Sequence, residues 1–548
     1  MYTSQQALHY PRSLAGLLLS LCLLLIGGCQ SENSTSTAAD LRITATSIAD
    51  GASQVGTTPD ISFTFSEPLD TATVNIASFI LSDANGLPVS GNITLNADRT
   101  VATFVPDAPL AGKGLYVATL TTAIRALNGN RLATDYSLAF NTGAWTVQAG
   151  TTGDESIEAM TAGQGNICLA GQTTGSPDGT ANAGGRDALI VVYGINGVYS
   201  WTRLLGTAAD DIAHAVAMDG QSNLYVAGET AGALAPGVTA QGQDLFLAKF
   251  DREGNHLWTR QYGSPGDDVA LDMALDGDGN VYLAGKTNDS LDGITTASGD
   301  DGFLIKLDAD GNPLWIRQIA STAGTETAQA VAIDANGQAC VTGSTTGDLD
   351  GNAASGLNDI FLACYDTNGT RLWLSMIRRL PNGITTELSA ENARAITIDG
   401  TGNLYIAGDR LDPFDPKSGI EMLIAKFDAS GNSVWVEIPV NAGNDLANDL
   451  LLDDQGNLYV AGQSDGTFAG QSSAGADDII LMKYGSDGTQ QWIRQSGSAS
   501  FDVPLAMTRT ADGLILVGGQ TDGALDGNTV IGGTDLFIRL YAPDGSLR

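Results

Sequence analysis

Short apolar stretches recur along the chain, each followed by a turn rich in Gly, Asn and Asp. Residues 212–228 show the pattern, with IAHAVAM, the turn DGQS and then NLYVAG. A second pair follows at 244–260, with DLFLAKFD, the turn REGN and HLWTR. Apolar runs of this length between turn residues predict β-strands. No long stretch has the 3.6-residue apolar period of a helix bundle, so we expect an all-β protein.

This four-strand unit repeats, and a tryptophan marks each copy. All seven Trp stand at one repeat position, with gaps of 56 to 62 residues: Trp145, Trp201, Trp258, Trp315, Trp373, Trp435 and Trp492. Four strands at such a period are typical of β-propeller blades. The register begins at Trp145 and ends at Arg548, just before an eighth Trp would fall. We therefore predict a seven-bladed β-propeller over 144–548, closed by the strand at Trp145, because that pairing removes both free sheet edges.

The composition of the repeat also predicts where its strands lie in the ring. The Ala-rich first strand suits the crowded axis of a ring, and the Trp suits the rim, where a large side chain fills the space between splayed blades. The recurring pattern Gly/Asp-Asn-x-Tyr-x-x-Gly, then Asp-x-Phe-x-x-Lys-x-Asp-x-x-Gly and Trp, resembles the SBBP-type β-propeller repeat across 145–548. That family occurs in exported and surface proteins of bacteria and has no general biochemical role, so the resemblance implies the fold and no ligand.

A smaller all-β region precedes the repeats. Residues 41–143 alternate strand-like runs with turns and have no helical pattern, which predicts a β-sandwich. The motif Phe65-Ser66-Glu67-Pro68-Leu69-Asp70, the turn Asn128-Gly129-Asn130 and the closing Phe140-Asn141-Thr142-Gly143 resemble the bacterial Ig-like domain of S-layer and surface proteins. The resemblance implies a spacer with no catalytic role.

The N-terminus predicts export. Residues 1–28 contain an apolar run, Leu14–Ile26, which is too short for a typical membrane span and matches a signal peptide. The following Cys29 completes a segment that resembles a bacterial lipobox, which implies that Cys29 becomes a lipidated N-terminus. The Ser/Thr/Ala-rich segment 29–40 then predicts a flexible tether. Because Gln30 is not Asp, the resemblance implies the outer membrane or cell surface, with the lipid as the membrane contact.

Charge narrows the range of partners. The chain has 26 Lys and Arg against 62 Asp and Glu, a formal charge of −36. Such a surface repels phosphate backbones, which excludes nucleic acid. A glycan or a surface protein remains as the expected partner, and we expect a monomer. His214 and His256 are too isolated for a His-based metal site or proton relay.

Two acidic positions recur at the ends of strands near the long loops. One opens the first strand of a repeat and the other opens the third: Glu155, Asp211, Asp268, Glu326, Asp445 and Asp502; then Asp187, Asp244, Asp301, Asp359, Glu421, Asp478 and Asp535. The first interpretation is structural, with the carboxylates accepting loop N–H groups. Two strand spacings place the sets roughly 10 Å apart, so a shared calcium ion needs a further loop carboxylate. Asp292, Asp350 and Asp526 are the candidate calcium ligands.

Other acidic segments have a simpler explanation. Turns such as Asp276-Gly277-Asp278-Gly279-Asn280 have the Gly and Asn of β-hairpin turns. An EF-hand loop requires Gly at its sixth place, where this segment has Val281, so we expect hairpin turns and not calcium loops.

The fifth repeat departs from the others. Its 62-residue length comes with four Arg that are candidate ligand-binding residues, because loops on a rigid scaffold carry recognition: Arg378, Arg379, Arg394 and Arg410. The competing interpretation is that their charges pair with acids such as Asp409.

The sequence has no Ser/His/Asp set, P-loop, G-x-S-x-G motif or adjacent Cys pair, and we name no catalytic residue. We expect a non-catalytic, lipid-anchored surface recognition or scaffold protein that displays a β-propeller on an Ig-like spacer. The alternatives are a propeller enzyme acting on extracellular polysaccharide, since two acids can perform glycosidase chemistry, and a calcium-stabilised adhesion-type module. Cys340 and Cys364 fall on neighbouring strands, so their spacing allows a disulfide without establishing it. We expect buried free thiols for both and for Cys168.

Overall fold

The computed structural model describes residues 41–55, 59–107, 110, 114–142, 145–195, 197–239, 242–291, 299–354, 357–377, 390–411 and 419–548. Their regular structure consists of β-strands and three one-turn 3₁₀ helices, η1 (Thr71–Thr73), η2 (Pro177–Gly179) and η3 (Leu525–Gly527). The predicted all-β class is confirmed. Contacts divide the described chain into two compact units, and the boundary along the chain falls between Trp145 and Thr146. Within these residues no helix has the length and apolar character needed to cross a membrane.

The first unit is a sandwich of two four-stranded sheets. One sheet has the order β1 (Ile43–Thr46), β3 (Ile61–Phe65), β6 (Val101–Pro106) and β5 (Gly91–Leu95). The other has the order β2 (Ala52–Val55), β8 (Tyr136–Thr142), β7 (Leu115–Leu120) and β4 (Phe79–Asp83). Alternate residues point inward, as in β3, where Ile61, Phe63 and Phe65 are buried. These side chains join Phe79, Phe104 and Phe140 in one apolar core.

The motifs that resembled an Ig-like domain lie together in this unit. Glu67 accepts hydrogen bonds from the side-chain amides of Asn128, at 2.5 Å, and Asn130, at 2.9 Å. Leu69 forms an isolated β-bridge with Ala126. The motif therefore fastens the loop after β3 to the turn before β8.

The second unit consists of four-stranded sheets, numbered here in chain order. Sheet 1 contains β10 (Glu155–Gly163), β11 (Asn166–Thr173), β12 (Asp187–Gly194) and β13 (Tyr199–Leu205); sheet 2 contains β14 (Asp211–Met218), β15 (Leu224–Thr230), β16 (Asp244–Phe250) and β17 (His256–Tyr262). Sheet 3 contains β18 (Asp268–Leu275), β19 (Val281–Thr287), β20 (Asp301–Leu307) and β21 (Pro313–Ile319); sheet 4 contains β22 (Glu326–Ile333), β23 (Ala339–Thr345), β24 (Asp359–Tyr365) and β25 (Arg371–Met376). Sheet 5 contains β26 (Ala390–Ile398), β27 (Leu404–Leu411), β28 (Ile420–Phe427) and β29 (Ser433–Glu437); sheet 6 contains β30 (Asp445–Leu452), β31 (Leu458–Ser464), β32 (Asp478–Tyr484) and β33 (Gln490–Ser496). Sheet 7 contains β34 (Asp502–Arg509), β35 (Ile515–Thr521), β36 (Asp535–Tyr541) and β9 (Thr146–Ala149).

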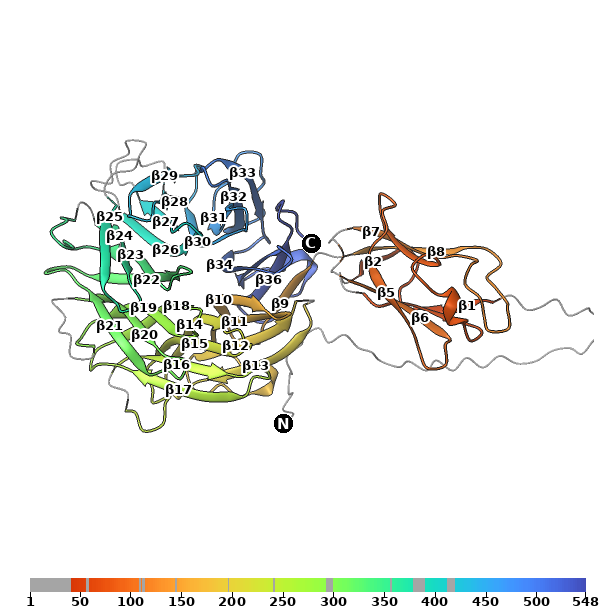
Figure 1. Ribbon diagram of the computed structural model, residues 1–548, viewed down its shortest axis with the longest axis horizontal. Helices are drawn as coiled ribbons and strands as arrows, with labels where there is room; N and C mark the ends of the chain where they lie inside the picture. The colour runs from red at the N-terminus through yellow and green to blue at the C-terminus, as the bar shows by residue number, and fades with distance from the viewer. Residues whose placement is uncertain are drawn as a thin grey trace, which may run out of the picture. The chain divides into compact units, whose positions relative to one another are not determined.

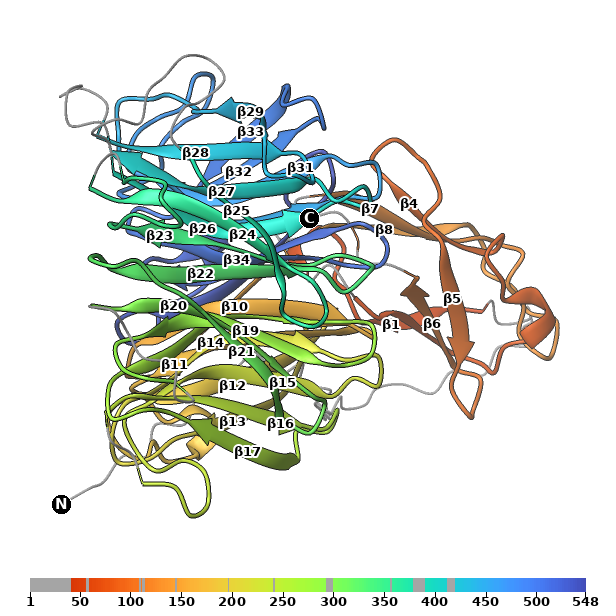
Figure 2. The same cartoon turned by 60° about the vertical axis from the view of Figure 1, so that its left-hand side comes forward.

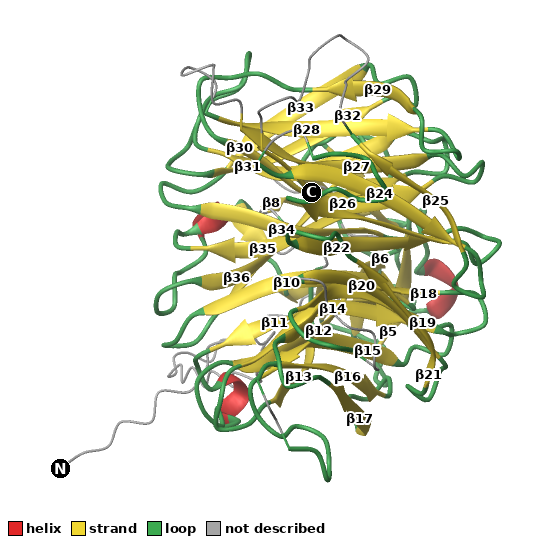
Figure 3. Cartoon of the chain, turned by 90° about the vertical axis from the view of Figure 1, so that its left-hand side faces the viewer, coloured by secondary structure: helices red, strands yellow, loops and turns green. Residues whose placement is uncertain are grey.

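These sheets are arranged around a common centre (Figure 1). The first strands of consecutive sheets contact one another, from β10 through β14, β18, β22, β26 and β30 to β34, and β34 contacts β10. The fourth strands, such as β17 and β21, lie toward the periphery in the same view. A turn of 60° shows the sheets stacked one after another (Figure 2), and loops gather at both ends of the strands (Figure 3).

Sheet 7 combines strands from the two ends of this unit. β9 pairs antiparallel with β36, with Gln148 opposite Phe537 and Val147 opposite Ile538. The Gln148 side chain donates to Asp535 Oδ2 at 2.9 Å and to the Gly523 carbonyl at 3.0 Å. Its Oε1 accepts the Leu525 N–H at 3.0 Å. The β-strand that was expected at Trp145 thus begins one residue later.

The tryptophans pack between neighbouring sheets. Trp201 of β13 donates its Nε1–H to the Arg252 carbonyl of sheet 2 at 3.3 Å. Gly254, whose φ is +78°, lies against the Trp201 ring so closely that an added Cβ would stand 2.8 Å from Cδ2. The guanidinium of Arg203 lies 5.2 Å from the ring centroid. Only Gly fits this position, which explains why Gly recurs in the turn and supports the structural role predicted for the tryptophans.

The Asp-Gly-Asn segments form tight hairpin turns, as predicted. Asp276 Oδ1 accepts the N–H groups of Asp278 at 3.0 Å and Asn280 at 2.9 Å. Its Oδ2 accepts from the Asn280 side chain at 2.8 Å. Gly279 adopts a φ of +84°, the left-handed conformation that the turn requires. These hydrogen bonds span at most four residues, so a short sequence segment suffices to predict the turn; Asp276 also forms an ion pair with Lys306 of β20, at 3.3 Å.

The expectation of free thiols is wrong for one pair of cysteines. Cys340 of β23 lies directly opposite Cys364 of β24, and the two form a disulfide with a Cα–Cα distance of 4.1 Å. The strand pairing itself supplies the close approach that a disulfide needs. Cys168 is a free and buried thiol, as expected.

Candidate functional site

The acids that open the first strands are held by the loops preceding them. Glu155 accepts the Thr151 N–H at 2.7 Å and the hydroxyl of Thr173 at 2.7 Å. The N–H groups of Thr207, Ser264, Ser321 and Ser498 bind Asp211, Asp268, Glu326 and Asp502 in the same way. The structural interpretation of this acidic set is confirmed, because its members satisfy buried N–H and hydroxyl donors.

In four sheets the acid that opens the third strand accepts a hydrogen bond from a glutamine on the outermost strand. Gln261 donates to Asp244 at 2.7 Å, and its Oε1 accepts the N–H groups of Leu234 and Ala235. The same bond recurs between Gln318 and Asp301, between Gln495 and Asp478, and between Gln148 and Asp535. Gln261, Gln495 and Gln148 therefore fix both the acid and the long loop of their own sheet, whereas Gln318 binds the acid.

The two acidic sets meet between sheets. Burial raises the pKa of Asp187, and the charge of Asp211 on the next sheet raises it further. Burial also raises the pKa of Asp244, with Asp268 of the next sheet adding to the shift. The sequence estimate of roughly 10 Å compared two acids of the same sheet. It missed this contact, because the third strand of one sheet lies beside the first strand of the next.

The described candidate calcium ligands are each paired with an arginine. Asp350 forms an ion pair with Arg371. Asp526 accepts from Arg539 Nη2 at 2.8 Å and from the Thr146 hydroxyl at 2.6 Å. Asp292 lies outside the described residues. Across the described ranges, no three His, Cys, Asp or Glu side chains gather closely enough to hold a metal ion.

The basic candidates of the fifth repeat are partly paired. Arg394 Nε lies 2.6 Å from Asp409 Oδ1, and 41% of its side chain remains exposed. Arg410 is buried beside Glu421, with Nε and Oε2 3.4 Å apart. Arg378 and Arg379 lie outside the described residues. Charge pairing therefore accounts for the two described members, and only Arg394 is open to solvent.

The most variable positions of the repeat lie at a β-bulge in each first strand. The residue skipped by the register is of six types in the seven sheets, with Leu in two of them: Glu158, His214, Leu271, Gln329, Arg394, Asn448 and Leu505. Bulges re-aim side chains and are frequent beside functional sites. We call these positions the bulge ring. Of these residues, only Arg394 was a candidate from the sequence. A position of changing residue type between the alanines of the first strand could have identified the others.

Two acids replace alanine next to the bulge ring. Asp272 follows the bulge of sheet 3 and Asp449 that of sheet 6, where the other sheets have Ala159, Ala215, Ala330, Ala395 and Ala506. Asp272 Oδ2 accepts the Val331 N–H of sheet 4 at 2.8 Å, and Asp449 Oδ2 accepts the Met507 N–H of sheet 7 at 2.5 Å. Each acid thus joins two neighbouring first strands.

Burial raises the pKa of Asp272 to about 6 and that of Asp449 to about 7. The charge of Asp272 adds to the shift of Asp449, although sheets 4 and 5 lie between their sheets in chain order. At pH 5 the folded protein keeps protons on these groups that the unfolded chain, with carboxyl pKa values near 4, releases. Their stabilising contribution is therefore complete at low pH and is lost as the pH rises through 6 and 7.

We expect the free energy of unfolding to fall by roughly 4 kcal/mol between pH 5 and 8 from these two groups. In the double variant Asp272→Ala/Asp449→Ala, which restores the residue of the other sheets, this part of the slope should vanish. Urea unfolding at several pH values measures it, and the difference between the two proteins cancels all other titrations. Parallel pH profiles for the two proteins would contradict the assignment.

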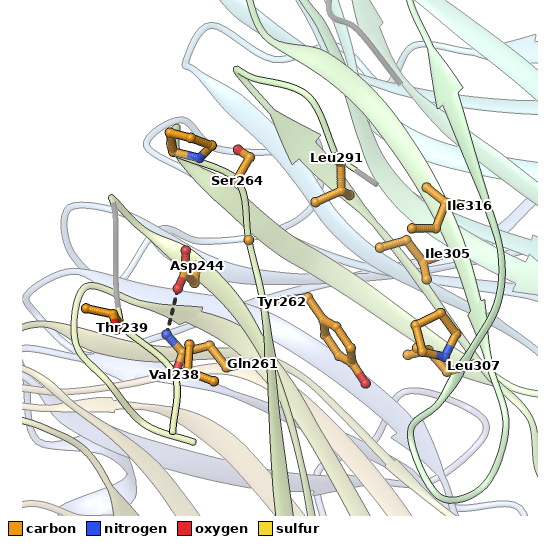
Figure 4. A pocket seen from close by; sticks show the side chains of 13 residues that line it. Val238, Thr239, Asp244, Gln261, Tyr262, Ser264, Leu291, Ile305, Leu307 and Ile316 are labelled. Atoms are coloured by element: carbon orange, nitrogen blue, oxygen red, sulfur yellow. Dashed lines mark hydrogen bonds between the residues drawn. The ribbon is translucent and has the colours of Figure 1, made fainter. Parts of the chain in front are cut away.

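A cavity of about 580 Å³ lies between sheets 2 and 3 (Figure 4). Its apolar lining includes Val238, Leu291, Ile305, Leu307 and Ile316, and its polar lining includes Thr239, Asp244, Gln261, Tyr262 and Ser264. Figure 4 shows the bond between Gln261 and Asp244 near one end and the Tyr262 ring pointing toward Leu307 at the other. The volume is in the range of small-molecule sites. No sequence pattern had predicted this cavity.

With the sheets and their contacts described, the fold defines the class: an all-β protein that combines a small sandwich with propeller-type repeats. Family models agree with both parts. The model for the bacterial Ig-like domain matches residues 37–142, and the model for the β-propeller repeat matches residues 200–234 and 257–292. The chain therefore carries a bacterial Ig-like domain followed by SBBP β-propeller repeats.

Comparison with individual proteins adds distant relatives. An uncharacterized WD repeat-containing protein of Acanthamoeba polyphaga mimivirus is 22% identical over 50% of this chain and 26% of its own length. The regulatory protein FlaEY of Caulobacter vibrioides is 24% identical over 48% of this chain and 29% of its own. The chain thus spans less than a third of these relatives. Among solved structures, an ulvan lyase has 11% identity and a TM-score of 0.44 over 73% of this chain and 97% of its own.

Proposed function

We propose that this is an exported, lipid-anchored surface protein that recognises a glycan or a surface protein without catalysis. In this proposal Cys29 bears the lipid, the segment 29–40 is the tether, and the Ig-like domain is the spacer that displays the repeats. The same proposal holds that sheets 1–7 form a closed seven-bladed β-propeller, with β9 as the closing strand.

Gln148 supports closure through β9. Its side chain makes for sheet 7 the bonds that Gln261 makes for sheet 2 and Gln495 for sheet 6: to the third-strand acid, to a loop carbonyl and to a loop N–H. In those sheets the glutamine belongs to the fourth strand. β9 therefore has the side-chain chemistry of a fourth strand as well as its pairing.

The proposed recognition role rests on the difference between residues that recur in the sheets and residues that vary among them. The acids, glutamines and tryptophans that recur in the sheets are engaged with backbone groups and with neighbouring sheets. The bulge ring carries Glu, His, Gln, Arg or Asn in five sheets and Leu in the other two, within otherwise similar strands. Residues that vary within a rigid repeat scaffold are suited to recognition. A mixture of acidic, basic and amide groups fits a polar partner such as a glycan or a protein loop.

Replacement of Cys29 tests the anchoring. We expect the native protein to incorporate a clickable fatty acid and to fractionate with membranes, because acyl chains give stable attachment. In Cys29→Ala the label should be absent and the protein should no longer fractionate as a lipoprotein. Cys168→Ala, which changes a buried thiol of the repeats, serves as the matched control and should behave like the native protein. Labelling that persists in Cys29→Ala would reject the lipid anchor.

A further inference from the structure

We propose that the cavity between sheets 2 and 3 binds an uncharged, largely apolar molecule of about two fused rings, which donates a hydrogen bond to Asp244. The site is separate from the bulge ring of the proposed recognition function. It is defined by one departure from the repeat, by the chemistry of the cavity wall and by one unused acceptor.

The cavity exists because sheet 3 lacks an aromatic side chain that the other sheets possess. The last residue of the third strand, or its equivalent, is a buried aromatic in six sheets: Tyr193, Phe250, Tyr365, Phe427, Tyr484 and Tyr541. In sheet 3 this residue is Leu307, which pairs with Val281 in the same register. The missing ring leaves space against sheet 2.

A compensating aromatic occupies only part of that space. Tyr262, at the end of β17, stands where sheets 1 and 3 have Leu205 and Ile319. Its hydroxyl donates to the Gly311 carbonyl beyond Leu307, so the ring is fixed. The cavity of about 580 Å³ remains with Tyr262 as one of its walls.

The wall chemistry selects an uncharged ligand. Ile305, Leu307 and Ile316 form an apolar surface, and no Lys or Arg is among the lining residues. An anion would therefore meet the acidic Asp244 without a compensating cation. The polar groups are concentrated around Asp244 and Gln261, as expected of a pocket that orients a mainly apolar molecule.

One acceptor in the cavity, Asp244 Oδ1, has no hydrogen-bond donor among the described residues. Gln261 is fully engaged, since its amide donates to Asp244 and Gly232 and its oxygen accepts two loop N–H groups. Asp244 is 3% exposed, and within the described residues it accepts one hydrogen bond, from Gln261 to Oδ2. Because no donor among the described residues binds Oδ1, we assign this oxygen as the acceptor for a ligand hydroxyl.

Fluorescence titration with 2-naphthol tests the site. We expect saturable binding of 2-naphthol to the native protein. Binding should be weakened about tenfold or more in Leu307→Phe, because this variant fills the cavity with the aromatic ring that Phe250 provides in sheet 2. Leu307→Phe/Tyr262→Leu recreates the pair Phe250 and Leu205 of the preceding interface, so it should fold normally and also lose binding. Leu314→Phe makes the same substitution at a side chain that is 53% exposed on β21 and should bind as the native protein does.

Two further probes test the polar contact. 2-Methoxynaphthalene lacks the donor and naphthalene-2-sulfonate carries a negative charge, so both should bind the native protein more weakly than 2-naphthol. A crystal soaked with 6-bromo-2-naphthol should show anomalous bromine signal beside Leu307, independently of any variant. Absence of 2-naphthol binding, equal binding to Leu307→Phe and Leu314→Phe, or tighter binding of the sulfonate would overturn the proposal.

Discussion

Replacing Asp526 with Ala is expected to lower the free energy of unfolding by about 3–5 kcal/mol, because the buried guanidinium of Arg539 loses its ion-pair partner. Arg539 is 2% exposed, and its Nε and Nη2 donate to Asp526 at 3.1 and 2.8 Å. Removing the carboxylate leaves the Ser496 hydroxyl, 2.9 Å from Nη1, and the neighbouring Tyr541 hydroxyl as uncharged partners of the guanidinium. Urea unfolding followed by circular dichroism measures the change.

A compensating substitution separates the buried charge from other causes. The residue equivalent to Arg539 in sheet 6 is Met482, which pairs with Val460 as Arg539 pairs with Val517. Asp526→Ala/Arg539→Met should therefore recover most of the lost stability, since it removes the charge together with its partner. The same samples test calcium. A melting temperature that rises with Ca²⁺ in the native protein, but not in Asp526→Ala, would show that the carboxylate binds the ion and contradict the pairing.

Replacing Gln148 with Leu is expected to cost about 3 kcal/mol, although the side-chain volume is nearly kept. The change removes three buried hydrogen bonds. It leaves the Leu525 N–H without its acceptor, whereas the Asp535 carboxyl keeps the Ile531 N–H and the Gly523 carbonyl keeps the Thr521 hydroxyl. Unsatisfied buried polar groups cost roughly 1–3 kcal/mol each, with partial relaxation. The same unfolding measurement reports the loss.

Gln261→Leu is the matched control for this variant. It breaks the same kinds of bonds, but all of them join residues of sheet 2, whereas Gln148 lies more than 370 positions from its partners. Both variants should lose stability to a similar degree, and only Gln148→Leu should release β9 for rapid proteolysis near Thr146. Equal resistance of the two variants at that site would contradict the role of Gln148 in closure.

The parts of the fold that depend on local bonds were predictable from the sequence. The Asp276 turn is determined by contacts two and four residues away, so its pattern identifies a hairpin without any knowledge of the rest. The Trp201 contact with Gly254 recurs between sheets, so the period of about 57 residues in the sequence already contains it.

The parts that depend on neighbouring sheets were not predictable in the same way. The estimate for the acids considered one sheet, but Asp244 meets Asp268 of the next sheet. The cavity arises from a single change, Leu307 in place of an aromatic residue, together with Tyr262 on another sheet. A comparison of the repeats position by position could flag both residues, but only the packing shows that they face one space.

The acids at the common centre have the same limitation. Asp272 and Asp449 interrupt an Ala pattern, which is visible in the sequence. Burial raises both pKa values, and the charge of Asp272 adds to the shift of Asp449; both effects depend on the arrangement of first strands around the centre. The disulfide was left open for a similar reason, because spacing allows it but the register of β23 and β24 makes it.

Hydrogen exchange of β9 tests closure of the ring most directly. The proposed propeller requires that Thr146–Ala149 is the outer strand of sheet 7, as β33 is of sheet 6. Mass spectrometry of peptides from the native protein should then show β9 amides exchanging as slowly as those of β33, because both are bonded to a third strand. Exchange of β9 within seconds, with β36 also unprotected along that edge, would contradict a ring closed by this strand.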